Sequence, residues 1–298
     1  MTDLLPILFS SLQIMTPLLL AATGGLFAEL SGRLNVALEG QLLIGAFFAV
    51  FAVHHTGSLF AGLAVSCLAS LACSALLAFV GLKLRSNIFI AGLAVNLLAN
   101  GLSIVLSHRF FDTRGLVALR DFRALPAVRL PLLDRSGAIG DIVSGHTAYV
   151  YAAWGLLLLS WLAIFKTPFG YRLRACGKHA AELEALGMKP DTYRWIAFLV
   201  SGFFCGIAGS LISLRIGGFV PNMTGGRGWI ALVVIFLGLR RPLGLFLAAF
   251  LFGLAEALAN YVQGLDVPAS LVLALPYLVT FFSMILVSIL TKKRNSIV

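Results

Sequence analysis

Charged residues are scarce in this sequence. Only 11% of its 298 residues are Asp, Glu, Lys or Arg, and 60% are hydrophobic, whereas soluble domains average about 25% charged and about 45–50% apolar residues. A chain with so few charges cannot cover a water-facing surface with polar groups, so the composition excludes an ordinary soluble domain. It predicts instead that much of the apolar surface faces lipid.

Sequence motifs for catalysis and metal binding are also missing. The four cysteines form no CxxC pair and three lie in apolar segments, which is typical of small packing residues. There is no GxxxxGK[ST] phosphate loop, because Gly177 and Lys178 are followed by His179. His54 and His55 cannot share one metal ion from adjacent helical positions. No serine-triad or paired-carboxylate arrangement is present, so we expect no catalytic, cofactor or metal site in this chain.

Long apolar runs dominate the sequence. A bilayer-spanning helix needs about 20 mostly apolar residues, and eight segments meet this requirement. They are Leu4–Phe27, Val36–Val53, Leu59–Leu82, Ile88–Leu106, Ala148–Phe165, Trp195–Leu214, Leu243–Val262 and Ser270–Leu290. A ninth run, Gly228–Leu239, is too short to span alone and is expected to form a half-helix or a tilted element. The pattern predicts an all-α, polytopic membrane helix bundle of about eight to nine transmembrane segments, built as a single domain over residues 1–298.

The net charge of +10 arises from lysines and arginines in short runs between the apolar segments. This distribution indicates the positive-inside pattern of a membrane protein and not a nucleic-acid-binding patch. If the basic C-terminus is cytoplasmic and the segments alternate, the N-terminus lies outside. Residues 107–147 then form a long extracytoplasmic loop and residues 166–194 a cytoplasmic loop. The short outside loops contain only two basic residues, Arg215 and Arg227.

Two glycine-rich segments, 24–40 and 217–229, interrupt the apolar pattern. Each follows a predicted span, contains an arginine and leads into another apolar run. They are predicted to break helices near the middle of the membrane, one entering from each side. An inverted repeat would produce this arrangement, and chance similarity is the alternative. Since backbone at this depth must be buried in protein or face water, these segments are candidates for lining a pathway.

Polar side chains within the spans point to the same region. Asn96 and Asn100 are four residues apart, as are Glu256 and Asn260, so each pair shares one helix face. Placing a charge in the bilayer costs about 2.5–3.5 kcal/mol on insertion scales. Two interpretations stay open, namely a hydrophilic solute pathway and polar contacts between helices. The predicted translocation-path residues are Asn35, Glu39, Asn96, Asn100, Asn222, Glu256 and Asn260.

The cytoplasmic loop 166–194 contains a short helical pattern. Helix-forming residues run from His179 to Leu186, Gly187 is placed as a C-cap and Pro190 lies beyond it. A small apolar stripe on this helix consists of Ala180, Leu183 and Leu186. The helix is expected either to dock into a groove of a partner protein or to rest on lipid headgroups.

Three separated motifs resemble one known family. Residues 167–187 are similar to the Thr-x-x-Gly-x-x-x-Arg-Ala-x-Gly…Ala-Ala-x-x-x-Gly stretch of bacterial ABC permeases of the branched-chain amino acid and simple sugar class. Residues 32–40 and 222–232 resemble the Ser-Gly-x-x-Asn-Ile-Gly-Leu-Glu-Gly and Asn-Met-x-x-Gly-Arg-Gly-Phe-Ile-Ala-Leu elements of the nucleoside-type subgroup. The departures are Ala37 for a glycine, Trp229 for a phenylalanine and Gly187 one position late.

The resemblance implies a multi-pass permease subunit of an ATP-driven importer in the bacterial inner membrane, with purine nucleosides or related compounds as solutes. It also implies an ABC ATPase that binds the ATP, a second permease subunit in a heterodimer, and an extracytoplasmic substrate-binding lipoprotein. The residues expected to couple the chain to the ATPase are Arg174, Ala175, Gly177, Ala180, Ala181, Glu182, Leu183 and Gly187.

Other functions stay open at this point. An ABC permease of the same class for simple sugars such as ribose, or for branched-chain amino acids, would share most of these features. An ion-coupled secondary carrier that uses Glu256 as a proton site is a second class. A membrane assembly protein is a third. The sequence lacks a set of acidic residues within the spans that could couple transport to protons or sodium ions. This lack and the short cytoplasmic helix favour the ABC permease.

Overall fold

The computed structural model of the protein describes residues 4–113, 115–119, 127–129 and 138–263, together with Leu278 and Ile285. The described chain is largely helical, which confirms the all-α prediction. Seven helices are long and apolar enough to cross a membrane. They are α1 (Leu4–Leu30), α2 (Leu38–Thr56), α3 (Leu59–Ala78), α4 (Ile88–Phe111), α6 (Ala148–Lys166), α9 (Pro190–Ile216) and α11 (Pro242–Val262). The eighth predicted span, Ser270–Leu290, lies outside the described residues except for Leu278 and Ile285.

The remaining elements are short. They are the π-helical turn η1 (Phe79–Lys83), helices α5 (Ala138–Val143), α7 (Pro168–Lys178), α8 (Ala180–Ala185) and α10 (Arg227–Leu237), and strands β1 (Val117–Ala118) and β2 (Gly218–Phe219). Helix α10 is the short ninth segment of the sequence analysis. The two strands pair antiparallel, with Val117 opposite Phe219. This pairing, which the sequence did not predict, ties the long loop to the segment that follows α9.

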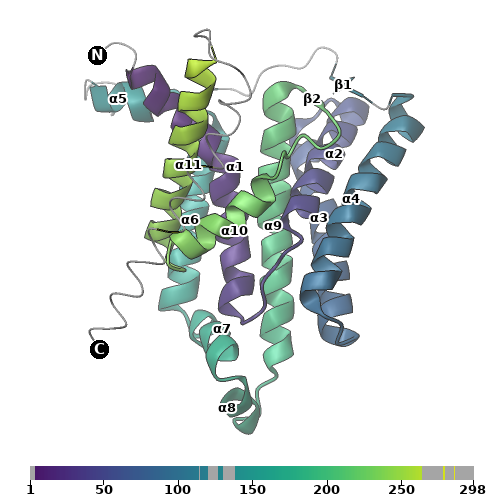
Figure 1. Ribbon diagram of the computed structural model, residues 1–298, viewed down its shortest axis with the longest axis vertical. Coiled ribbons are helices and arrows are strands. Elements are labelled where there is room, and N and C mark those ends of the chain that lie inside the picture. Colours follow the sequence, from purple (N-terminus) through teal and green to yellow (C-terminus); the bar gives the residue numbers. More distant parts are fainter. Residues whose placement is uncertain are drawn as a thin grey trace.

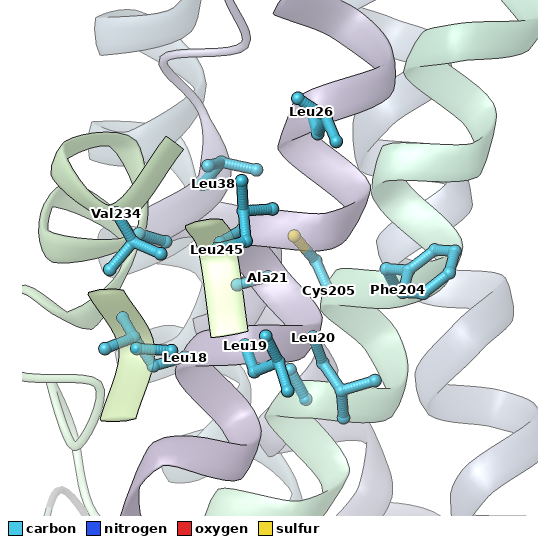
Figure 2. Packing of buried hydrophobic residues seen from close by; sticks show 14 of the residues in the cluster. Leu18, Leu19, Leu20, Ala21, Leu26, Leu38, Phe204, Cys205, Val234 and Leu245 are labelled. Atoms are coloured by element: carbon cyan, nitrogen blue, oxygen red, sulfur yellow. The ribbon is translucent and has the colours of Figure 1, made fainter. Parts of the chain in front are cut away.

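Helices α1 and α9 form the centre of the bundle. Figure 1 shows them running side by side, with α2, α3 and α4 on one side and α6, α10 and α11 on the other. The side chains of Met15, Leu19 and Leu20 on α1 are fully buried. Figure 2 shows Leu20 and neighbouring α1 residues among Phe204 and Cys205 of α9. Residues 15–28 of α1 are all buried, so this part of the helix is surrounded by protein.

Small residues let α9 approach α2 and α3 closely. A Cβ atom on Gly206 would lie 2.5 Å from the Cα atom of Cys67, so only glycine fits there. At the same crossing, Ser66 on α3 donates a hydrogen bond to the carbonyl oxygens of Gly45 (2.8 Å) and Gly206 (2.7 Å). Small residues and interhelical hydrogen bonds are the usual basis of helix packing in membranes, where lipid supplies no hydrophobic driving force.

The two predicted breaks are present. Helix α1 ends at Leu30, and residues 31–37 return the chain towards the middle of the bundle, where α2 begins (Figure 1). Helix α9 ends at Ile216, and residues 217–226 return in the opposite direction to the start of α10. The two helix–break–helix units therefore run in opposite senses, which is the arrangement that an inverted repeat predicts.

Candidate functional site

The start of α10 lies deep in the bundle and is held by a carboxylate from α2. Glu39 accepts a hydrogen bond from the backbone N–H of Gly226 at Oε1 (2.9 Å) and another from that of Gly228 at Oε2 (2.6 Å). The first amides of a helix have no partner within the helix, and its N-terminus carries a partial positive charge. A carboxylate at this position accepts hydrogen bonds from these amides and also neutralises the partial positive charge. A side chain on Gly228 would overlap the backbone of Glu39, so the starts of α2 and α10 are in direct contact.

The start of α2 is held in turn by an amide from α4. Asn96 Oδ1 accepts a hydrogen bond from the backbone N–H of Gly40 (2.7 Å), and its Nδ2 donates to the carbonyl oxygen of Val36 (2.9 Å). One side chain thereby satisfies a donor and an acceptor that the break in the helix leaves free. Backbone N–H and C=O groups buried in a membrane need such hydrogen-bond partners within the protein.

Asn35 organises the break itself. Its side chain is fully buried. Nδ2 donates to Gln41 Oε1 (3.0 Å) and to Ser201 Oγ on α9 (2.8 Å), and Oδ1 accepts from the backbone N–H of Ala37 (3.0 Å). The break between α1 and α2 is therefore anchored to α9 as well as to α4.

A polar cavity of about 210 Å³ lies between α1, α9, α10 and α11. Arg227, the first residue of α10, forms an ion pair with Glu256 on α11 (Nη2 to Oε1, 2.5 Å), and both side chains are about 30% exposed. Gln13, Arg215 and Asn260 complete the polar lining, and the remaining lining residues are apolar side chains of α1 and α9. Ionisable groups within membrane spans usually face such a cavity and mark a functional site.

The predicted path residues fall into two groups. Asn35, Glu39 and Asn96 hold the broken helices at the centre, whereas Glu256 and Asn260 line the polar cavity; the ion pair of Arg227 at the α10 start connects the two groups. The other two predicted residues lie apart. Asn100 is partly buried one turn further along α4, and Asn222 is exposed in a turn with a φ of 60°.

Sequence reasoning did not select Gln13, Arg215 or Arg227 for this site. A signal was present, since Arg215 and Arg227 are the exceptions to the positive-inside distribution among the short outside loops. An arginine retained on the disfavoured side of a membrane indicates a local role. Within the described ranges, no group of three or more His, Cys, Asp or Glu side chains is placed to hold a metal ion.

The predicted coupling segment consists of two helices and not of one. Helix α7 ends at Lys178, His179 adopts a non-helical conformation, and α8 begins at Ala180. The predicted single helix from His179 to Leu186 is thus shorter at both ends. In the expected stripe Leu183 is buried, but Leu186 is 73% exposed. Gly187 follows α8 with a φ of 77°, as expected of the residue that ends a helix.

The predicted coupling residues occupy both helices and the residue that follows. Arg174, Ala175 and Gly177 lie on the last turns of α7. Ala180, Ala181, Glu182 and Leu183 lie on α8, and Gly187 comes after it. Glu182 pairs with His179 at 2.7 Å. Figure 1 shows α8 at the end of the bundle opposite the N-terminus.

Helix α7 packs directly against the end of α1. A Cβ atom on Gly32 would lie 2.9 Å from the Cα atom of Gly177, and one on Gly177 would overlap the carbonyl oxygen of Leu30. The neighbouring thiol of Cys176 donates a hydrogen bond to the carbonyl oxygen of Pro190 (3.4 Å). Burial of Cys176 raises the pKa of this thiol. The predicted coupling segment therefore contacts the helix break that carries Asn35.

The chain matches a family model described as the permease component of a branched-chain amino acid transport system, over residues 7–288. The chain belongs to this permease family. Together with the seven apolar helices, membership makes it a multi-pass membrane protein of the ABC permease class, and an ABC permease implies an ATPase partner.

Relatives cover most of the chain. It is 31% identical to the nucleoside ABC transporter permease protein NupC of Lactococcus lactis, over 89% of this chain and 86% of the relative. It is 30% identical to the guanosine ABC transporter permease protein NupQ of Bacillus subtilis, over 90% and 87%. A putative glucose ABC transporter permease protein, TsgC13 of Haloferax volcanii, is 32% identical over 87% and 78%. These relatives are permease subunits.

A solved structure has the same fold. The complex of PsaBC from Streptococcus pneumoniae with a Fab contains a chain that aligns with a TM-score of 0.51 at 13% identity, over 92% of this chain and 89% of that chain. At this identity the likeness shows the fold alone.

Proposed function

We propose that this permease carries purine nucleosides, or closely related solutes, through an ATP-driven importer. The observation that carries the proposal is the match, along nearly the whole chain, to relatives named as nucleoside and guanosine permeases. The three motifs of the sequence analysis point to the same subgroup.

The polar cavity supports this class of solute. Glu256 is the one acidic residue in the described lining, and Arg227 already neutralises its carboxylate. The described lining therefore offers no free carboxylate for the ammonium group of an amino acid. What the cavity offers is the guanidinium of Arg215, the amides of Gln13 and Asn260, and apolar walls. These groups suit a neutral solute with several hydrogen-bonding atoms and flat apolar faces. A simple sugar is the second candidate, because one relative is named as a putative glucose permease.

The chain is proposed to work with three partners. An ABC ATPase would bind and hydrolyse ATP, since this chain has no phosphate loop of its own, and would contact α7 and α8. A second permease subunit would complete a heterodimer. An extracytoplasmic binding lipoprotein would deliver the solute to residues 107–147, whose six arginines and four aspartates suit a salt-sensitive contact at the rim of an interface.

The packing supports a route from the ATPase to the cavity. A movement of α7 would reach the break at Gly32 through the backbone contact with Gly177. The break continues into α2, where Glu39 holds the first amides of α10. The first residue of α10, Arg227, is the ion-pair partner of Glu256 in the cavity. The three steps are a backbone contact, a pair of hydrogen bonds to a carboxylate and a side-chain ion pair, through which displacement of one element would move the next.

Competition for uptake tests the solute. Cells that express the complete transporter take up labelled guanosine in the presence of excess unlabelled nucleoside, ribose or leucine, and cells without this chain supply the background. We expect other purine nucleosides to compete, and ribose and leucine to have no effect. If ribose or leucine is transported and nucleosides are ignored, the proposed solute is wrong although the permease class stands.

A further inference from the structure

Arg215 is the charged residue of the polar cavity for which the architecture gives no partner. It lies in the last turn of α9 and lines the cavity. Its charge interacts with those of Glu256 and Arg227, but its guanidinium makes no hydrogen bond or close ion pair with another residue in the described part of the chain. Arg227, by contrast, donates to Glu256 and to the carbonyl oxygen of Met223.

A purely structural role would be to complement the dipole at the C-terminal end of α9, where a cation is favoured. That role needs only charge and would be met equally well by lysine. Arg215 is exposed at the end of its span and lines the cavity, so its guanidinium is accessible to a ligand there. The planar fork of an arginine side chain is suited to binding two neighbouring acceptor atoms at once.

We propose that Arg215 binds the base of the transported nucleoside and selects 6-oxopurines over 6-aminopurines. A 6-oxopurine such as guanine presents a carbonyl oxygen and a ring nitrogen side by side, both acceptors, and the guanidinium fork pairs with both. Adenine presents an acceptor beside an amino donor, so it can accept only one of the two bonds. The inference rests on the proposed function and adds the base preference and the residue that sets it.

The size and walls of the cavity agree with this assignment. Its volume of about 210 Å³ is below the roughly 300–1,000 Å³ of pockets that enclose a whole drug-sized ligand, so the cavity suits a purine base better than a whole nucleoside. Ile14 and Pro17 on α1 and Leu211 and Ile212 on α9 also line the cavity and would supply apolar contacts for a base.

The test compares guanosine with adenosine uptake by the complete transporter carrying Arg215→Gln, Arg215→Met or the matched control Arg85→Gln. Arg85 is an exposed arginine two residues after η1, and it does not line the cavity. Since a bidentate arginine–guanine pair contributes about 1–3 kcal/mol of discrimination, we expect the guanosine-to-adenosine ratio of kcat/KM to fall about 5-fold or more in both Arg215 variants. The selectivity of the binding protein cancels, because the same binding protein serves every variant.

The outcomes separate cleanly. An unchanged ratio in either Arg215 variant, or an equal loss for both nucleosides, would overturn the inference and leave the charge as a structural feature of α9. Arg215→Met, which removes every hydrogen-bond donor of the side chain, decides the question if Arg215→Gln fails to reach the membrane. A wild-type transporter that takes up no nucleoside would instead defeat the proposed function, and that result precedes any comparison of variants.

Discussion

At the scale of single residues, two polar side chains in the membrane core bind backbone groups at the helix breaks. Glu39 satisfies the first amides of α10, and Asn96 satisfies one donor and one acceptor at the start of α2. Each unsatisfied backbone group in a lipid environment costs several kcal/mol. These side chains therefore make the two helix breaks stable, and the breaks in turn allow a polar cavity to exist within an apolar bundle.

Replacing Glu39 by glutamine is expected to lower the thermal stability of the detergent-solubilised protein and to reduce nucleoside uptake. Glutamine has a single acceptor oxygen, so one of the amides of Gly226 and Gly228 loses its partner, and hydrogen bonds to charged groups contribute about 1.5–3 kcal/mol each. Thermal unfolding followed by size-exclusion chromatography measures the change. Glu184→Gln, which alters an exposed carboxylate on α8, is the control and should leave the midpoint unchanged. Equal midpoints for both variants would show that Glu39 does not hold α10.

The sequence could identify these residues but not their partners. Asn96 stood out because an amide in an apolar span is costly. Its hydrogen-bonded partner Gly40 lies 56 residues away, and Gly226 lies 187 residues from Glu39. Spacing along one helix cannot reveal such contacts, so capping of a broken helix and contact with a solute look the same in the sequence. The structure describes the capping contacts and leaves the solute contacts of Glu256 and Asn260 as predictions.

At the scale of elements, the apolar runs located the spans but not their ends. The first span was predicted to end at Phe27, and α1 continues to Leu30. The sixth was predicted from Trp195, and α9 begins at Pro190. Hydropathy follows the part of a helix that faces lipid or protein core, whereas the helix itself continues into its polar flanks. The same limit explains why α7, whose composition is polar, was not separated from α8.

Helix α7 gives a direct test of the route from the ATPase to the cavity. Gly177→Ala would place a methyl group against the carbonyl oxygen of Leu30, so α7 must shift away from α1. We expect uptake to fall while ATP hydrolysis by the assembled transporter persists. The matched control is Gly155→Ala in α6, where a Cβ atom meets nothing within 4 Å and alanine is the better helix former. Normal uptake by the Gly177 variant would argue that this contact does not transmit the movement.

At the scale of the whole molecule, the seven described spans and the two breaks place the N-terminus and the α7–α8 segment at opposite ends of the bundle (Figure 1). This agrees with the orientation inferred from the lysine and arginine distribution. The general architecture followed from the sequence because lipid imposes a simple rule on helix length and composition. The packing order of the helices did not, because their apolar surfaces are alike.

Reporter fusions test the orientation. A reporter that is active only in the cytoplasm should be active at His179 and inactive at Gly137, and one that is active only outside should give the reverse result. The reason is that the basic loop 166–194 stays on the side where translocation of positive charge is disfavoured. Activity of the same reporter at both positions would refute the alternation of spans on which the pathway is based.

The central claim is that this chain forms the membrane pathway of an ATP-driven nucleoside importer. The most direct measurement reconstitutes it in liposomes with its ATPase, its partner permease and the binding protein, with MgATP enclosed on the ATPase side. The account predicts that labelled guanosine accumulates with MgATP, that a non-hydrolysable ATP analogue abolishes accumulation, and that an uncoupler has no effect. Accumulation driven by a proton or sodium gradient without ATP would contradict it and would identify the chain as an ion-coupled carrier.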